Sequence, residues 1–330
     1  MIKLQHKLVM ILFLTSTIIY GAEAQQVTFL NGEDSLSGHY FLPDNGKPRA
    51  VIIFVHGDGP LEYDAHGYYP LIWKRLLNQG FAVFSWDKPG VGESTGNWLA
   101  QSMKQRQQEV QSAIDYVRNS YGYSGSQIGL LGFSQAGWVV PKLANKNTDI
   151  GFIIGIGFAI DWSEQSWYLT RARLTQQGAQ SSEIKAAHKA HIEEIAFLGQ
   201  QPSYESYLKK YGHTAHDLTE ARYEFILENF SVNATQDYIG LQQPMLLLLG
   251  DKDLNVNILN TKSVVEKLAG NHQHMQISII KNATHGMLDS KYFNEQTPGL
   301  SFLLKLMWKR EKAVVPEFYM VLEEWLNLQN

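Results

Sequence analysis

The chain has 330 residues, of which 44% are apolar and 18% are charged, and its formal net charge is -4. This length suits one large α/β domain with an insertion, and the composition argues against global disorder. Lysine and arginine form no cluster, so we expect no nucleic-acid partner. The chain has no cysteine, which excludes disulfides and a lipid-modified N-terminal cysteine.

Segment 1–24 has the pattern of a secretory signal peptide. Two lysines precede a mainly apolar run, Leu8–Tyr20, and the small residues Ala22 and Ala24 stand at the two positions that signal peptidase reads. The run is shorter than the roughly 20 residues of a transmembrane helix. We therefore expect export to the periplasm or the medium with cleavage after Ala24; an uncleaved N-terminal anchor is the alternative.

Short β-rich apolar runs then alternate with segments of helical period, which predicts a parallel sheet wrapped by helices. Inner runs such as Ala50–Val55 are apolar without alternation, as expected for strands that are covered on both faces. Helices are predicted over Tyr69–Leu77, over Met103–Val117 and from Pro316 onward. The predicted strands are Val27–Leu30, Gly38–Leu42, Ala50–Val55, Ala82–Trp86, Gln127–Gly132, Phe152–Phe158, Met245–Leu249 and Gln276–Ile280.

The alternation stops between Asp161 and Tyr238, where the pattern indicates only three or four amphipathic helices. We interpret 161–238 as a helical cap inserted into a core made of 25–160 and 239–330. Its aromatic residues are candidates to roof an apolar acyl pocket, although most helix aromatics pack in a core. They are Trp162, Trp167, Tyr168, Phe197, Tyr204, Tyr207, Tyr223 and Phe225.

A Gly-Phe-Ser-Gln-Ala-Gly motif spans 132–137, between a predicted strand and a predicted helix that begins near Gln135. A serine on so sharp a strand-to-helix turn needs small residues two positions to either side, and Gly132 and Ala136 meet this need. A chance Gly-x-Ser-x-Ala match is the alternative, but the placement favours Ser134 as a nucleophile.

A second glycine-rich turn, His-Gly-Asp-Gly-Pro at 56–60, directly follows the predicted strand Ala50–Val55. Such a turn can present a backbone N–H to a tetrahedral oxyanion. We assign the two oxyanion-hole donors to the amides of Asp58 and Gln135. A free carboxylate on Asp58 would repel the oxyanion, so its side chain is expected to be paired or to point away.

His285 is the candidate general base, because it lies in the loop after the last predicted strand, within reach of the carboxyl edge of the sheet. The candidate acid is Asp253, a few residues past the preceding strand. Asp251 is expected to be structural. Asp161 is a third candidate, but it is equally placed to cap a helix.

Two other histidine pairs are possible metal ligands. His188 and His191 fall on one face of an insertion helix, and His272 and His274 fall in a polar loop. Neither pair has an evident third ligand, so we expect no metal.

The chain resembles the α/β-hydrolase superfamily over Gln25–Asn330, with serine, acid and histidine in the expected order. The His-Gly-x-Gly-Pro turn, the stretch 87–96 (similar to Asp-x-Arg/Pro-Gly-x-Gly-x-Ser) and the cap resemble the bacterial esterase and serine aminopeptidase (S33-type) branch. The resemblance implies a mostly parallel eight-stranded sheet and a covalent acyl-enzyme. It also implies that Asp87, Gly90 and Gly92 shape a loop beside the site.

The leading interpretation is an exported serine hydrolase that cleaves a small-molecule carboxylic ester through an acyl-enzyme on Ser134, with no metal, cofactor or coenzyme. A serine aminopeptidase or amidase with the same triad is the alternative, in which Glu193 or Glu194 of the cap would hold the substrate amino group. A non-catalytic binding protein on the same fold is an alternative from another class, but the complete set of serine, acid and histidine argues against it.

Overall fold

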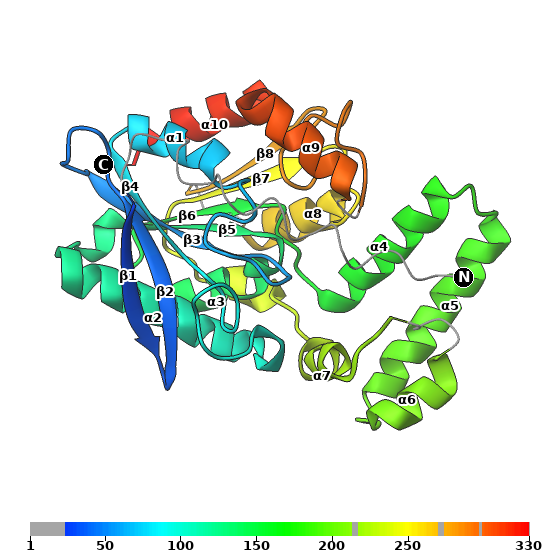
Figure 1. Cartoon of the computed structure of the whole chain (residues 1–330). Coiled ribbons are helices and arrows are strands. Elements are labelled where there is room, and N and C mark those ends of the chain that lie inside the picture. The colour runs from blue at the N-terminus through cyan, green and yellow to red at the C-terminus, as the bar shows by residue number, and fades with distance from the viewer. Residues whose placement is uncertain (1–23, 213–216, 270–273, 297–298, 330) are drawn as a thin grey trace.

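The computed structural model describes residues 24–212, 217–269, 274–296 and 299–329. In this part of the chain eight strands form one sheet in the order β1-β2-β4-β3-β5-β6-β7-β8 (Figure 1). Strands β3 to β8 are parallel, whereas β2 pairs antiparallel with β1 and β4. The strands are β1 (Gln25–Asn31), β2 (Asp34–Phe41), β3 (Ala50–Val55), β4 (Phe81–Trp86), β5 (Ile128–Phe133), β6 (Phe152–Ile156), β7 (Met245–Gly250) and β8 (Met275–Ile280).

All eight predicted strands are present, and the fold is the mostly parallel α/β sheet expected from the sequence. Strand β6 is two residues shorter than predicted because Gly157 has a φ of +58°, which ends the extended conformation at Ile156. The predicted signal peptide lies outside the described residues except for Ala24.

Helices cover both faces of the sheet, which explains its uniformly apolar inner strands. Neighbouring residues of a strand point to opposite faces, so Ile53 packs in one core and Ile52 in the other. The first core includes buried residues of α2 (Met103–Tyr121), α3 (Val140–Ala144) and α8 (Ile258–Ala269). The second includes buried residues of α1 (Pro70–Asn78), α9 (Leu300–Lys309) and α10 (Pro316–Leu326).

The cap leaves the sheet after β6 and returns to it at β7. It contains α4 (Trp162–Gln176), α5 (Ser181–Leu198), α6 (Tyr204–Tyr211) and α7 (Glu220–Asn229), followed by the 3₁₀ turn η4 (Thr235–Tyr238). Figure 1 shows α4, α5 and α6 projecting to one side of the core, with α7 between the core and α6. An isolated bridge between Asp161 and Asn233 closes the base of the cap.

The cap has a small core of its own, in which Leu198, Tyr207 and Tyr223 are buried together. Several of its aromatic side chains are therefore used for packing within the cap. Trp162 instead stacks on Trp138 of the main core, with ring centroids 4.9 Å apart. These contacts leave fewer cap aromatics to roof a pocket than the sequence suggested.

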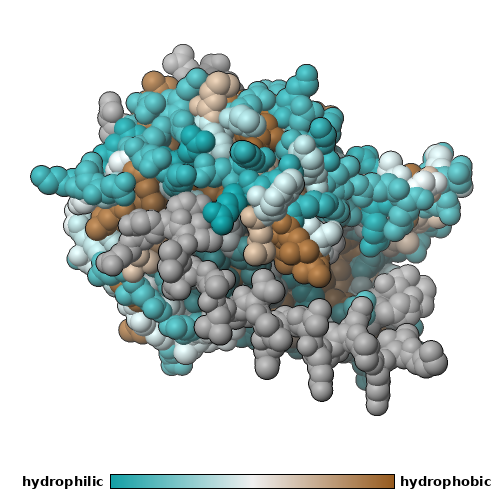
Figure 2. Space-filling model, turned by 45° about the horizontal axis from the view of Figure 1, so that its top comes forward, coloured by the Kyte–Doolittle hydropathy of each residue, from teal (hydrophilic) through white to brown (hydrophobic). Residues whose placement is uncertain are grey.

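The remaining short elements are the 3₁₀ turns η1 (Trp98–Ala100), η2 (Gly125–Gln127), η3 (Ser134–Trp138) and η5 (Arg310–Ala313). The face in Figure 2 is mostly hydrophilic, with separate apolar patches. Helix α9 exposes Leu300, Leu304 and Met307. Within the described ranges, no helix has both the length and the apolar character needed to span a bilayer.

Candidate active site

Ser134 lies at the tight turn that follows β5. Its φ is +50°, in the left-handed region that residues other than glycine rarely adopt. An ideal Cβ on Gly132 would lie only 2.8 Å from the Cβ of Ala136, so the turn leaves no room for a side chain at 132. The chain after Ser134 is the 3₁₀ turn η3, and α3 begins only at Val140, later than predicted.

His285 and Asp253 come together at the carboxyl edge of the sheet. Nδ1 of His285 lies 2.8 Å from Oδ2 of Asp253. The other carboxylate oxygen accepts the backbone N–H groups of Asn255, at 2.7 Å, and Val256, at 2.8 Å. Asp253 is buried. The carboxylate is therefore held in one orientation, and it favours the tautomer of His285 that carries its proton on Nδ1 and leaves Nε2 free to accept one.

The pKa of His285 reflects two opposing effects. Burial lowers it, but the charge of Asp253 and the hydrogen bond to it outweigh burial, so the pKa is raised above its ordinary value of 6.5. An imidazolium at this position is thus stabilised by its neighbour, as a general base requires.

The other two candidate acids lie elsewhere. Oδ1 of Asp161 accepts the backbone N–H of Glu164 at 2.8 Å and so caps α4. Asp251 forms an ion pair with Lys252, at 3.4 Å. Among the three predicted candidates, the structure brings only Asp253 to His285.

The loop 56–59 follows β3 and lies beside Ser134. An ideal Cβ on Gly57 would be only 3.4 Å from the Cβ of Ser134. The carboxylate of Asp58 is paired with Arg222 of α7, whose Nη1 and Nη2 donate to its two oxygens at 3.0 and 2.6 Å. Burial raises the pKa of Asp58, but the bonds and charge of Arg222 outweigh it and lower the pKa overall. The carboxylate of Asp58 is thus ionised and paired, as expected for a side chain that must not repel the oxyanion.

Two buried cations, which the sequence did not reveal as site residues, hold the carbonyl groups of this loop. Arg106 of α2 donates to the carbonyl of His56 at 2.7 Å, and Lys88 donates to those of Gly57 and Gly59 at 3.2 and 2.9 Å. Both cations are almost completely buried. Arg106 also donates to the side-chain oxygen of Gln135, so one residue contacts both segments that carry the predicted oxyanion donors.

A family model described as serine aminopeptidase, S33, matches residues 46–291. The chain belongs to the S33 family of serine hydrolases. Solved structures share the fold at low identity: the Pyrococcus furiosus esterase Pf2001 is 15% identical, covers 93% of this chain and 91% of its own, and has a TM-score of 0.59. No curated protein matches the chain at the sequence level.

Two further structures are similar to this S33 hydrolase. The proline iminopeptidase of Mycobacterium smegmatis is 14% identical, with 92% and 98% of the two chains covered and a TM-score of 0.57. Est1E of Butyrivibrio proteoclasticus, solved with ferulic acid, has the same identity, coverage and TM-score. At such identities the likeness establishes the α/β-hydrolase fold and nothing finer.

Asp87, Gly90 and Gly92 lie in the loop after β4, as the family resemblance implied. Oδ1 of Asp87 accepts the backbone N–H of Tyr63 at 2.8 Å. An ideal Cβ on Gly92 would lie 2.3 Å from Oδ2 of Asp87, so the loop can wrap around the carboxylate only with a glycine there. Lys88, the next residue after Asp87, donates to carbonyls of the loop 56–59. The loop after β4 therefore lies against the predicted oxyanion loop, which fits a role in shaping the site.

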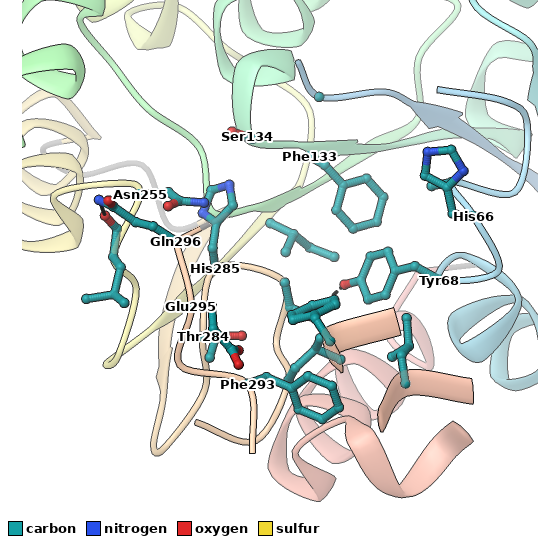
Figure 3. Close-up of a pocket in the computed structure, with 18 of the residues that line it drawn as sticks. His66, Tyr68, Phe133, Ser134, Asn255, Thr284, His285, Phe293, Glu295 and Gln296 are labelled. Atoms are coloured by element: carbon teal, nitrogen blue, oxygen red, sulfur yellow. Dashed lines mark hydrogen bonds between the residues drawn. The ribbon is translucent and has the colours of Figure 1, made fainter. Parts of the chain in front are cut away.

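Two cavities of the S33 hydrolase meet at Ser134. The first, here called the α9 cavity, has a volume of about 390 Å³ and is lined by Ser134, His285 and residues that include Tyr68 and Phe293. Figure 3 shows the imidazole of His285 turned toward Ser134, with Phe293 at the end of the cavity away from Ser134. The second, the cap cavity, has a volume of about 280 Å³ and is also lined by Ser134.

In the described part of the chain, no three His, Asp or Glu side chains gather into a group that could hold a metal ion. His188 and His191 pack against the ring of Trp167. Nε2 of His274 contacts the carbonyl of Leu241 at 2.8 Å, and His272 lies outside the described residues.

Proposed function

We propose that this S33 hydrolase cleaves carboxylic esters through an acyl-enzyme on Ser134. The observation that carries the proposal is the 2.8 Å contact between His285 and Asp253 in a cavity that Ser134 also lines. A histidine held by a carboxylate beside a half-buried serine at a tight turn is the arrangement that activates a hydroxyl group for acyl transfer.

The proposed reaction has two halves. Oγ of Ser134 bonds to the acyl carbon while its proton passes to Nε2 of His285, and the backbone amides of Asp58 and Gln135 donate to the oxyanion. The bond from carbon to the alcohol oxygen then breaks, and that oxygen takes the proton from His285. A water molecule, deprotonated by His285 in turn, attacks the acyl carbon; the bond from carbon to Oγ of Ser134 breaks, His285 returns the proton to Oγ, and the acid is released.

An amide or peptide substrate is the second candidate, and one observation favours it. Glu194 lines the cap cavity beside Ser134, and the hydroxyl of Tyr207 donates to it at 2.5 Å. Glu193, by contrast, is exposed and pairs with Lys189 at 3.8 Å. Glu194 is therefore the cap acid that would bind a substrate amino group, and the similar Mycobacterium smegmatis structure is named a proline iminopeptidase.

The apolar α9 cavity supports the ester proposal, because a peptide would bury its polar backbone there at a cost. We also propose that the protein is exported, on the pattern of segment 1–24, which makes an intracellular coenzyme thioester a poor substrate.

A rate panel on the purified protein tests these proposals. It should include esters, a thioester and aminoacyl anilides, together with a fluorophosphonate probe. We expect esters to have the highest kcat/KM, Ser134 to be labelled, and Ser134→Ala to lose both labelling and activity. If an anilide with a free amino group is the best substrate, and Glu194→Gln selectively abolishes its cleavage, the aminopeptidase function replaces the esterase function.

A further inference from the structure

The two cavities at Ser134 differ in which catalytic groups they contain. Ser134 and Asp58 line both cavities. His285 lines the α9 cavity and is absent from the described lining of the cap cavity. The nucleophile and the oxyanion loop are thus shared, whereas the general base faces only one of the two spaces.

This difference assigns the two halves of the substrate. In acyl transfer the histidine that deprotonates the serine must also protonate the leaving oxygen, so the leaving group lies against it. The acyl substituent points away from that position. The leaving alcohol of an ester therefore belongs in the α9 cavity with His285, and the acyl group belongs in the cap cavity.

The buried part of the α9 cavity lining is apolar, and its charged residues are exposed. Its buried lining includes Phe133, Ile156, Phe293 and Leu306. Lys252 and Glu295 also line it, and both are exposed to solvent. Figure 3 shows Phe133 and Tyr68 facing His285 across this space. Asn255, Thr284 and Gln296 also line the cavity, but its walls are mainly apolar and suit an alkyl or aryl chain better than a polar alcohol such as a sugar.

The cap cavity is smaller, and a larger share of its lining is polar. Gln165, Thr170, Glu194 and Arg222 all line it, alongside the two tryptophans Trp138 and Trp162. A long alkyl acyl chain would have to displace water from these groups without replacing their hydrogen bonds, which is unfavourable. A short or polar acyl group meets no such cost.

We infer that this enzyme acts on esters of an apolar alcohol, with the alcohol chain in the α9 cavity and a short or polar acyl group in the cap cavity. The inference rests on the proposed esterase function. It places the main source of substrate selectivity in the leaving group and therefore in the acylation half of the reaction.

Hexyl acetate and ethyl hexanoate test this inference because they are isomers that exchange the position of the long chain. The kcat/KM of each is measured on the full chain, since this constant reports acylation. Each buried methylene favours binding by about fourfold, so four additional methylenes in the apolar cavity should favour hexyl acetate by more than about tenfold. A ratio below about fivefold, or a preference for ethyl hexanoate, overturns the inference. Failure to cleave either ester contradicts the proposed function itself.

Two variants on one helix locate the effect. Leu303 lines the α9 cavity and is 39% exposed, so Leu303→Trp narrows the cavity without filling the core. We expect it to lower the ratio of kcat/KM for hexyl acetate to kcat/KM for ethyl hexanoate by at least about fivefold, which corresponds to the loss of slightly more than one buried methylene group. Leu304→Trp is the matched control, because Leu304 is 54% exposed and does not line the cavity. An unchanged ratio in Leu303→Trp, or an equal change in both variants, overturns the assignment of the cavity.

Discussion

The buried ammonium group of Lys88 donates to the carbonyl oxygen of Gly57 at 3.2 Å. The C=O of Gly57 and the N–H of Asp58 belong to one planar trans peptide and point in opposite directions. Lys88 therefore turns the amide of Asp58, our predicted oxyanion donor, away from the protein interior. Burial and the charge of Arg106 lower the pKa of Lys88 to about 7, but a neutral amine still donates N–H bonds.

Replacing Lys88 by methionine should lower kcat more than it affects KM. Removing an oxyanion-hole donor costs about 10² to 10³ in kcat, so releasing the peptide that carries one should cost roughly 10- to 100-fold. Steady-state kinetics at several pH values measures this, and a denaturant titration checks that the variant is folded. Since His285 is untouched, the acid limb of the profile should stay in place. A folded Lys88→Met variant with full kcat would show that the loop keeps its geometry without the lysine.

The ion pair between Arg222 and Asp58 joins the cap to the oxyanion loop. We expect its loss to destabilise the transition state and so to lower kcat. Without Arg222 the carboxylate of Asp58 loses the cationic partner bonded to it and keeps the hydrogen bond from Nε2 of Gln135, at 3.3 Å. Its charge then lies near the developing negative charge, and repulsion at that range is worth roughly tenfold in kcat after solvent screening. We therefore expect Arg222→Ala to lower kcat by about that factor.

The double variant Arg222→Ala with Asp58→Asn provides the decisive comparison, because it removes the repelling charge as well. It should recover most of the lost kcat. Arg173→Ala, in the exposed part of α4, serves as the control for loss of a cap arginine. If the double variant is as slow as Arg222→Ala, the effect arises from cap position and not from charge.

The activity should depend on pH through His285. Only the neutral imidazole accepts the serine proton, so kcat/KM should rise with pH as His285 loses its proton. Because Asp253 raises the pKa of His285, this rise should be centred above the ordinary value of 6.5. In Asp253→Asn the charge is gone, so the limb should move to lower pH while kcat falls by about 10⁴-fold. Asp161→Asn should change neither kcat nor the acid limb of the pH profile. If the acid limb stays in place in Asp253→Asn, Asp253 is not the residue that raises the pKa of His285.

Much of the site could be predicted because its residues sit at strand ends. Strands β3, β5 and β7 are uniformly apolar, so their ends are visible in the sequence, and the residues that follow them are brought together by the parallel sheet. The partners of the oxyanion loop could not be predicted in this way. Arg222 lies 164 positions from Asp58, on a cap whose orientation depends on tertiary packing. Lys88 is a buried lysine, which composition alone does not distinguish from a solvated one.

Gly157 is a further site residue that the sequence hides, and it gives the sharpest test of the geometry of His285. An ideal Cβ at Gly157 would lie 2.8 Å from both Cε1 and Nδ1 of the imidazole, and Nδ1 is the atom that contacts Asp253. Alanine there should push the ring aside, and a displacement of about 1 Å can cost roughly 100-fold in rate. The φ of +58° adds a backbone cost of about 1 kcal/mol in stability.

Gly178 separates these two effects. It has a φ of +76° in the turn after α4, but an ideal Cβ there would meet no atom within 4 Å. Gly178→Ala should therefore lose a similar amount of stability, about 1 kcal/mol, and keep its kcat. Gly157→Ala should lose stability and about 100-fold in kcat, as measured by denaturant unfolding and steady-state kinetics. Equal kcat in the two variants would mean that the imidazole of His285 tolerates a methyl group at position 157. The contact between His285 and Asp253 would then not depend on Gly157.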